Sequence, residues 1–166
     1  MKLTLHDQRQ LIAAEGWLEL GSWQDAQEEL ERITEEFQAH PAVLSVRYEI
    51  HAKARQWNGA AEIAGMLVKL LPHQPAFWVS LAYATRRKDD GGIPEAKLVL
   101  REARTQFPKD YLIAFNLACY ECQLGNRKAA MNLLETAIQL AGKNDIRAMA
   151  RADPDLEPLW NDISGV

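Results

Sequence analysis

The sequence lacks the features that mark several large functional classes. None of its apolar runs approaches the roughly 20 residues that cross a bilayer, so we expect no membrane insertion. The formal net charge is −4, without the basic excess typical of nucleic-acid binders. A Gly-rich phosphate loop, an HExxH motif and a nucleophile elbow are all missing. We therefore expect neither an enzyme nor a cofactor. The first residues also lack the apolar core of a signal peptide, which favours a cytoplasmic protein.

Cysteine is scarce, with only Cys119 and Cys122 in the sequence. Two cysteines do not make a disulfide framework. Their CxxC spacing falls inside an expected helix, whereas a reactive pair usually lies at a helix N-terminus, where the dipole lowers the thiol pKa. A structural zinc site would need two more ligands, and the four histidines are scattered. Thiol redox or metal binding is therefore kept as an alternative function, beside the simpler interpretation of two small apolar residues.

The sequence is rich in an internal repeat. The residues Ala26, Ala60, Ala96 and Ala130 are 34, 36 and 34 positions apart. Two further columns keep the same spacing: Leu30, Ala64, Leu100 and Leu134, and Ile33, Leu67, Ala103 and Ala137. Small and apolar residues at a fixed period predict pairs of helices that approach closely and stack on their neighbours.

The stretch from Trp78 to Pro108 carries the clearest unit of this repeat. It reads Trp78-x2-Leu81-Ala82, then a polar turn, then Ala96-x3-Leu100-x2-Ala103, and it ends at Pro108. This helix–turn–helix pattern resembles a tetratricopeptide (TPR) unit. The resemblance implies an all-α fold of the α-α superhelix class. It would be a right-handed TPR solenoid of about four helical hairpins with a C-terminal capping helix.

The repeat boundaries follow from the period. We expect a single TPR-like domain over residues 1–166, with repeats at about 7–40, 41–74, 75–110 and 111–142 and a cap at 143–166. The turn at 86–94 is two residues longer than its counterparts, which explains the single spacing of 36. A solenoid end otherwise exposes an apolar face, so we interpret the tail as a cap. The alternative is a detachable segment that competes for the binding groove.

In the TPR family the first helix of each pair lines a concave, peptide-binding surface. Carried over to this sequence, the groove residues are Glu15, Glu19, Glu49, Lys53, Tyr83, Arg86, Arg87, Phe115, Cys119, Cys122 and Gln123. Such a groove would be acidic at its start, basic in the middle and apolar at its end. It suits a protein or peptide partner of mixed charge, as in an adaptor, scaffold or co-chaperone.

Other ligands and roles are also found in the TPR family. Some TPR proteins hold the C-terminal carboxylate of heat-shock chaperones with a clamp of lysine, asparagine and arginine. The matching positions here are Leu11 and Glu15, then Ser45 and Val46, so we do not expect that ligand. A small TPR-type secretion chaperone that binds an exported client is an alternative. RNA binding by helical repeats is disfavoured by the acidic balance.

Overall fold

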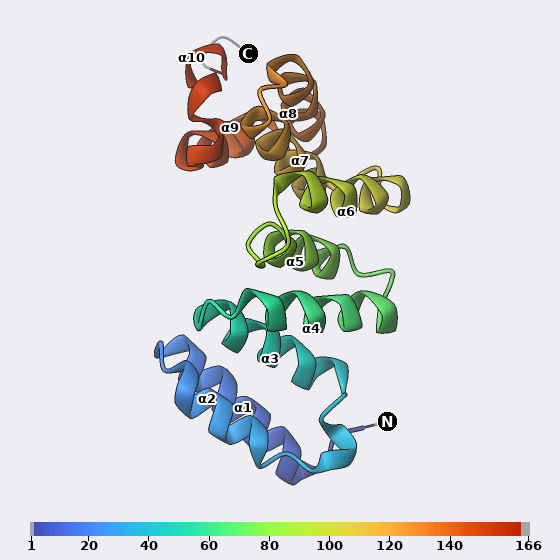
Figure 1. Cartoon of the computed structure of the whole chain (residues 1–166), viewed down its shortest axis with the longest axis vertical. Helices are drawn as coiled ribbons and strands as arrows, with labels where there is room; N and C mark the ends of the chain where they lie inside the picture. Colours follow the sequence, from blue (N-terminus) through green and yellow to red (C-terminus); the bar gives the residue numbers. More distant parts are fainter. Residues whose placement is uncertain (1, 164–166) are drawn as a thin grey trace. The chain divides into compact units, whose positions relative to one another are not determined.

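The computed structural model describes residues 2–163, and helices are the only regular elements in that range. In chain order these are α1 (Leu5–Glu19), α2 (Trp23–Glu31), the 3-10 helix η1 (Glu35–Phe37), α3 (Pro41–Lys53), α4 (Trp57–Leu70), α5 (Pro75–Thr85), α6 (Ile93–Gln106), α7 (Tyr111–Gln123), α8 (Arg127–Ala141), α9 (Lys143–Ala152), the 3-10 helix η2 (Pro154–Leu159) and α10 (Trp160–Ile163) (Figure 1). The expected all-α class is confirmed. Residues 164–166 of the expected cap lie outside the described residues.

The chain packs as two compact units, residues 1–90 and 91–166. Unit 1 contains α1 to α5, and unit 2 contains α6 to α10. The boundary between residues 90 and 91 falls in the long turn at 86–94 between α5 and α6. The expectation of a single domain over the whole chain stays a prediction.

Adjacent helices pack together within each unit, as the repeat predicts. In unit 1, α1 packs on α2, α3 on α4 and α4 on α5; in unit 2, α6 packs on α7 and α7 on α8. The first repeat column is fully buried, because Ala26, Ala60, Ala96 and Ala130 have no exposed surface. Small side chains at these points let the helix backbones approach, and the larger residues of the other two columns fill the space beside them.

Helix α3 is held from two sides. Val43, Val46 and Ile50 join the apolar cluster that α1 and α2 form around Leu30. On its other side, Tyr48 joins the cluster of α4 and α5. Each fully buried aliphatic side chain contributes about 1.5–3 kcal/mol, so both contacts stabilise the helix position. The remaining strip of α3 faces solvent.

Helix α2 ends earlier than the repeat predicts. The helical spacing of Ala26, Leu30, Ile33 and Phe37 in the sequence predicts one continuous helix, but α2 stops at Glu31 and Phe37 lies in η1. The reason is the buried carboxylate of Asp7, which accepts hydrogen bonds from the backbone N–H of Thr34 (2.9 Å) and its hydroxyl (3.0 Å). This contact draws the chain out of the helix, and Ile33 and Phe37 are nevertheless buried.

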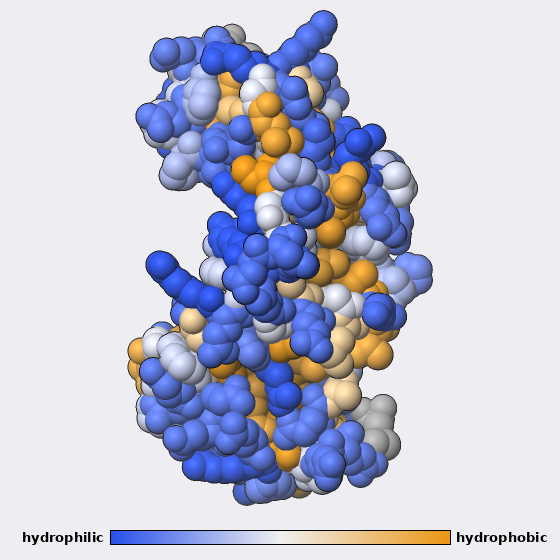
Figure 2. Space-filling model, in the orientation of Figure 1, coloured by the Kyte–Doolittle hydropathy of each residue, from blue (hydrophilic) through white to orange (hydrophobic). Residues whose placement is uncertain are grey.

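The glutamates of α2 lie mainly in solvent. The face of α1 and α2 visible in Figure 2 is largely hydrophilic, with a narrow apolar strip. Arg32 pairs with Glu29 at 2.7 Å and with Glu28 at 3.9 Å, and Arg32 and Glu28 are more than half exposed. The Glu29 side chain is only 15% exposed, whereas an exposed pair such as Arg32 with Glu28 contributes little to stability. The acidic run is thus a solvated surface.

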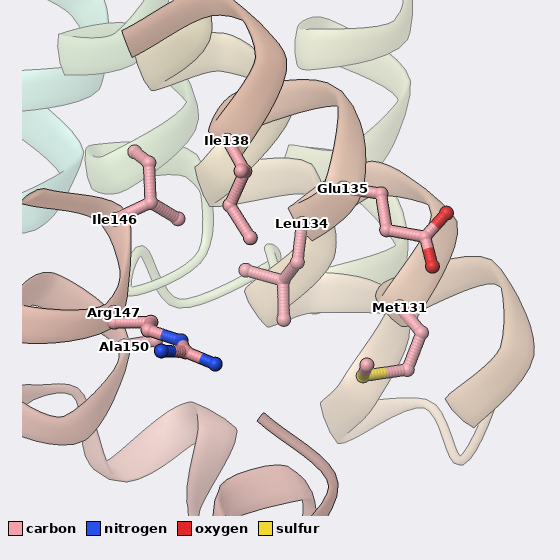
Figure 3. Close-up of a pocket in the computed structure, with 7 residues that line it drawn as sticks. All are labelled: Met131, Leu134, Glu135, Ile138, Ile146, Arg147 and Ala150. Atoms are coloured by element: carbon pink, nitrogen blue, oxygen red, sulfur yellow. The ribbon is translucent and has the colours of Figure 1, made fainter. Parts of the chain in front are cut away.

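Helix α9 covers the side of α8. Figure 3 shows Leu134 and Ile138 of α8 near Ile146 of α9, with Arg147 pointing along the same gap. The space between them is only about 10 Å³. That volume is about the minimum for one water molecule, so this seam is a packing contact and no ligand site. Helix α9 starts at Lys143, the first residue of the expected cap, and Asp145 lies in its first turn.

The segment after α9 folds over α7. Asp153 caps η2 by accepting a hydrogen bond from the N–H of Asp155 (2.9 Å). Leu156 and Leu159 of η2 are fully buried, and η2 packs on α7. The indole N–H of Trp160 donates to the carbonyl of Ala150 (2.8 Å), which fastens the segment to α9. In this structure the tail acts as a cover of α7.

Candidate functional site

Two adjoining cavities open on the solvent-facing strip of α3 in unit 1. The first has a volume of about 380 Å³ and is lined by Tyr48, Glu49, Ala52, Lys53, Trp57, Val79, Ser80 and Tyr83. The second has a volume of about 580 Å³ and is lined by Ala52, Lys53, Arg55, Trp57, Tyr83 and Arg87. Glu49, Ala52 and Lys53 share a face because they are three and four positions apart on α3. Val79 and Tyr83 share a face of α5 for the same reason.

The aromatic rings of Trp57 and Tyr83 line both cavities. The rings of Trp57 and Tyr83 meet edge to face, with centroids 5.7 Å apart and planes at 66°. The guanidinium carbon of Arg87 lies 3.4 Å from the Tyr83 ring centroid and 5.5 Å from that of Trp57. Arg87 also donates a hydrogen bond to the carbonyl of Tyr83 (2.9 Å). Cation–π contacts of this kind are favourable, so the Arg87 side chain is ordered before any ligand arrives.

Tyr48 forms the floor of the first cavity. Its hydroxyl donates to the carbonyl of Ser80 (3.2 Å), which ties α3 to α5. Burial raises the pKa of Tyr48 above its ordinary value of 10.0, so the phenol stays neutral at physiological pH. The floor is therefore an apolar ring with its polar atom already satisfied.

The charges are unevenly shared between the cavities. The first carries Glu49 and Lys53, one of each sign. The second carries Lys53, Arg55 and Arg87 and no carboxylate. Within residues 2–163, none of these three cations has a carboxylate oxygen within the 4.0 Å that defines an ion pair. The second cavity is thus lined by positive charge alone, whereas the first is of mixed charge.

The structure brings together four of the residues expected in a groove: Glu49, Lys53, Tyr83 and Arg87. Arg86 is half-buried and lines neither cavity. Glu15 and Glu19 are exposed on α1, which packs beside α3. Trp57 and Arg55 were not among the expected site residues. The sequence did hold a signal for Arg55: it stands 34 positions after Gly21, so an arginine takes the place of a turn glycine in the second repeat.

The expected apolar end of the groove is closed. Phe115, Cys119 and Cys122 are buried, each with at most 5% of its surface exposed, whereas a groove residue would be accessible. Helix α7 packs on α6, α8 and η2, and the Cys119 thiol donates a hydrogen bond to a carboxylate oxygen of Asp153 in the tail (3.5 Å). Gln123 is exposed and donates to the carbonyl of Asp155 (2.8 Å). In this conformation the α7 face receives η2 instead of a partner.

The two cysteines have the environment of structural residues. Neither cysteine forms a disulfide. Burial raises the pKa of Cys122 above 9.0, which disfavours the thiolate that redox chemistry and metal binding need. Among residues 2–163, no group of three or more His, Cys, Asp or Glu side chains has an arrangement that could hold a metal ion. Nor does any helix in that range have the length and apolarity to cross a membrane.

Comparison with known proteins supports the architecture. A thermophilic TPR protein from Thermus thermophilus has a similar solved structure, with a TM-score of 0.66 over 95% of both chains and 20% sequence identity. No model of a protein family matches the sequence, and no curated protein does. At this level of identity the likeness shows the fold alone. The fold is the all-α superhelix of the tetratricopeptide type that the repeat columns predict.

Proposed function

We propose that this tetratricopeptide-fold protein binds a peptide segment of a partner protein and that the two cavities of unit 1 anchor that segment. The observation that carries the proposal is the cluster of Trp57 at the start of α4, Tyr83 of α5 and Arg87 just after α5. Exposed aromatic and arginine side chains at a cavity are the groups that dominate protein recognition. Tyr83 keeps 43% of its surface exposed although a cation stacks on it.

The first cavity suits an apolar side chain of the segment. The Tyr48 ring forms its floor, and Ala52, Val79 and the Trp57 indole also line it. An apolar side chain placed there would remove its own surface and that of the rings from water, at about 25 cal/mol per Å². Because the Tyr48 hydroxyl is already bonded, no polar group on the floor loses a partner.

Binding would cost little ordering at this site. Arg87 is fixed by two rings and a backbone carbonyl before the ligand arrives. An immobilised side chain otherwise costs about 0.5–1.5 kcal/mol on binding. A pre-ordered arginine therefore raises affinity without an extra contact.

The remaining groove residues have different parts in the proposal. Glu15 and Glu19 extend the binding face along α1, where they would attract basic residues of the segment. Arg86 flanks the anchor. Phe115, Cys119 and Cys122 support the interior of unit 2 in the covered state, and Gln123 holds the tail. We assign no catalytic role, and we infer that the protein acts as an adaptor or scaffold through this site.

Selection from a phage-displayed library of random twelve-residue peptides tests the proposal. We expect wild-type protein to enrich a family of peptides that share an apolar residue. Tyr83→Ala should weaken binding of those peptides about tenfold or more, which is about 1.4 kcal/mol. Tyr111→Ala is the matched control, because Tyr111 is 39% exposed and lies outside the cavities. Circular dichroism should show unchanged helix content for both variants.

Two results would contradict the proposal. If wild type enriches no peptide family, the cavities are not a peptide anchor. If Tyr83→Ala and Tyr111→Ala bind the selected peptides alike, binding takes place elsewhere on the chain.

A further inference from the structure

The backbone at Arg55 has an unusual conformation. The turns after α1 and α7 contain Gly21 (φ +85°) and Gly125 (φ +79°), which tolerate the left-handed region because they lack a Cβ. The turn after α3 places Arg55 at the corresponding position, with φ +56°. It is the only non-glycine residue with a positive φ within residues 2–163. A side chain in this conformation is disfavoured, since the Cβ approaches the following carbonyl.

The fold does not require an arginine there. The turns at Gly21 and Gly125 close the same kind of hairpin without any side chain. The side chain of Arg55 is exposed, so it does not contribute to the apolar core. What it does is line the second cavity beside Lys53 and Arg87. Strained backbone of this kind tends to occur where a side chain must be aimed at a ligand.

The positive charges of Lys53, Arg55 and Arg87 repel one another, so placing them at one cavity costs free energy. They come from three segments: the end of α3, the turn after it and the turn after α5. One acidic group, Asp89, lines a neighbouring hollow with Arg55. Its carboxylate accepts a hydrogen bond from the side chain of Asn58 (2.6 Å) and makes no ion pair with Arg55. Glu49 lines the adjoining cavity with Lys53, but within residues 2–163 none of the three cations forms an ion pair with a carboxylate, on a protein whose net charge is −4.

We infer that Lys53, Arg55 and Arg87 form a subsite for a negatively charged side chain of the bound segment. This inference rests on the proposed function, and it adds the chemistry that the anchor selects. Two guanidinium groups can bind a carboxylate or a phosphate through paired, charge-assisted hydrogen bonds. The aromatic faces of Trp57 and Tyr83 form the wall next to it.

The position of the subsite also defines the motif. Both cavities share Ala52, Lys53, Trp57 and Tyr83 in their linings. An extended chain advances about 3.3 Å per residue, so cavities with a common wall receive side chains that are close in sequence. The recognised motif is an apolar residue with an acidic or phosphorylated residue beside it or a few positions away.

The test repeats the peptide selection with altered proteins. Wild type should enrich peptides in which Asp or Glu lies near the shared apolar residue. Arg55→Gly should still enrich the apolar residue but lose the acidic preference, and Arg55→Lys should keep it. The matched control is Lys69→Gln, which removes one positive charge at an exposed site on α4 outside the cavities. Displayed peptides are fused at their C-terminus, so a free chain end cannot produce the signal.

Calorimetry with one selected peptide then identifies the anion. Replacing its Glu by Gln should weaken binding to wild type about tenfold, as for loss of a charge-assisted pair, and should leave binding to Arg55→Gly unchanged. A phosphoserine version that binds more tightly than the Glu version would assign the subsite to phosphate, and one that binds more weakly would assign it to carboxylate.

The failures are distinguishable. Peptides enriched without any excess of Asp or Glu would overturn the anion subsite and leave the peptide anchor in place. An acidic preference that persists in Arg55→Gly would remove Arg55 from the subsite. If wild type enriches no peptides, the proposed function and this inference fall together. Arg55→Gly relieves backbone strain, so it should melt no lower than wild type, and lost binding cannot then be attributed to unfolding.

Discussion

Gly59 of α4 lies directly against the ring of His51 on α3. A Cβ at position 59 would be 2.6 Å from Nδ1 and 2.7 Å from Cε1 of that ring. Real Cβ contacts are essentially never so short, so a side chain here forces the imidazole to move. The glycine is thus required by the packing of α3 on α4 and not by its backbone angles.

Replacement of Gly59 by alanine should therefore destabilise the protein. In a helix the change usually stabilises by about 1 kcal/mol, but the clash with His51 should reverse the sign and cost about 1–3 kcal/mol. Urea unfolding followed by circular dichroism measures the difference. Gly65→Ala in the same helix is the control, because nothing lies within 4 Å of the added Cβ, and it should be stabilising. A double variant Gly59→Ala, His51→Ala should recover part of the loss, and no recovery would contradict the contact.

His51 should make the protein more stable at neutral than at mildly acidic pH. Burial lowers the pKa of His51 below 6.5, and the charge of Arg47 lowers it further. Nδ1 of His51 is buried and has no hydrogen-bond partner among the described residues. The neutral form is favoured in the folded state, so the contribution is complete above pH 6.5 and falls as pH drops below it. Urea midpoints at pH 5 and pH 8 should differ less in His51→Gln than in wild type. Equal differences in the two proteins would show that His51 does not titrate on unfolding.

Asp7 should contribute stability that is lost in stronger acid. Hydrogen bonds from Thr4 and Thr34 lower its pKa from 3.8 to about 2. The ionised carboxylate is favoured in the folded state, so this stability is present above pH 3.8 and is lost as pH falls toward 2. At pH 5 the urea midpoint of Asp7→Asn should therefore be lower than that of wild type. The difference between the two midpoints should be smaller at pH 2. Glu15→Gln on the exposed face of α1 serves as the control. A gap that does not change with pH would assign the effect to packing.

Detachment of the tail should expose the cysteines. Leu156 has no exposed surface, so Leu156→Asp places a charge in the contact between η2 and α7 and should favour the open tail. Cys119 and Cys122 should then react faster with a thiol-specific chromogenic reagent, about tenfold for each 1.4 kcal/mol of shift toward the open state. Leu98→Asp, at a side chain with 64% exposure, should leave the labelling rate near that of wild type. Unchanged rates in Leu156→Asp would mean that the tail does not protect the thiols.

Replacing Arg55 by glycine should raise the free energy of unfolding by about 1 kcal/mol. Glycine has no Cβ, so the left-handed conformation at position 55 would no longer bring a Cβ close to the following carbonyl oxygen. Thermal melting of the two proteins at equal ionic strength measures the change. Arg87→Gly is the comparison variant. Its backbone is not in the left-handed region and its side chain stacks on Tyr83, so this change should not raise the melting temperature. A lower melting temperature for Arg55→Gly would show that the arginine itself holds the turn.

The repeat made most of the architecture predictable. Ala26 and its counterparts recur at a fixed spacing because they lie where neighbouring helices come closest, and that demand is local and periodic. The end of α2 was not predictable in this way. It depends on Asp7 meeting Thr34, which lies 27 positions further along the chain and has no counterpart in the period.

The site was predictable only where helix spacing defines it. Glu49 and Lys53 fall on one face of α3, and the repeat places Tyr83 on the facing helix. The sequence could not reveal that η2 packs on α7, because η2 lies after the last repeat and its contact has no counterpart in the period. Nor did helix spacing identify Arg55, which lies in a turn and faces the cavity through its backbone conformation.

The left-handed arginine has a consequence for anyone who redesigns this fold. A consensus drawn from the repeats of the chain would place glycine at position 55, since Gly21 and Gly125 mark that column. The resulting protein would be expected to express well and resist heat. By our proposal it would also have lost its discrimination between partners, so an engineer screening for thermal tolerance alone would discard the specificity without noticing.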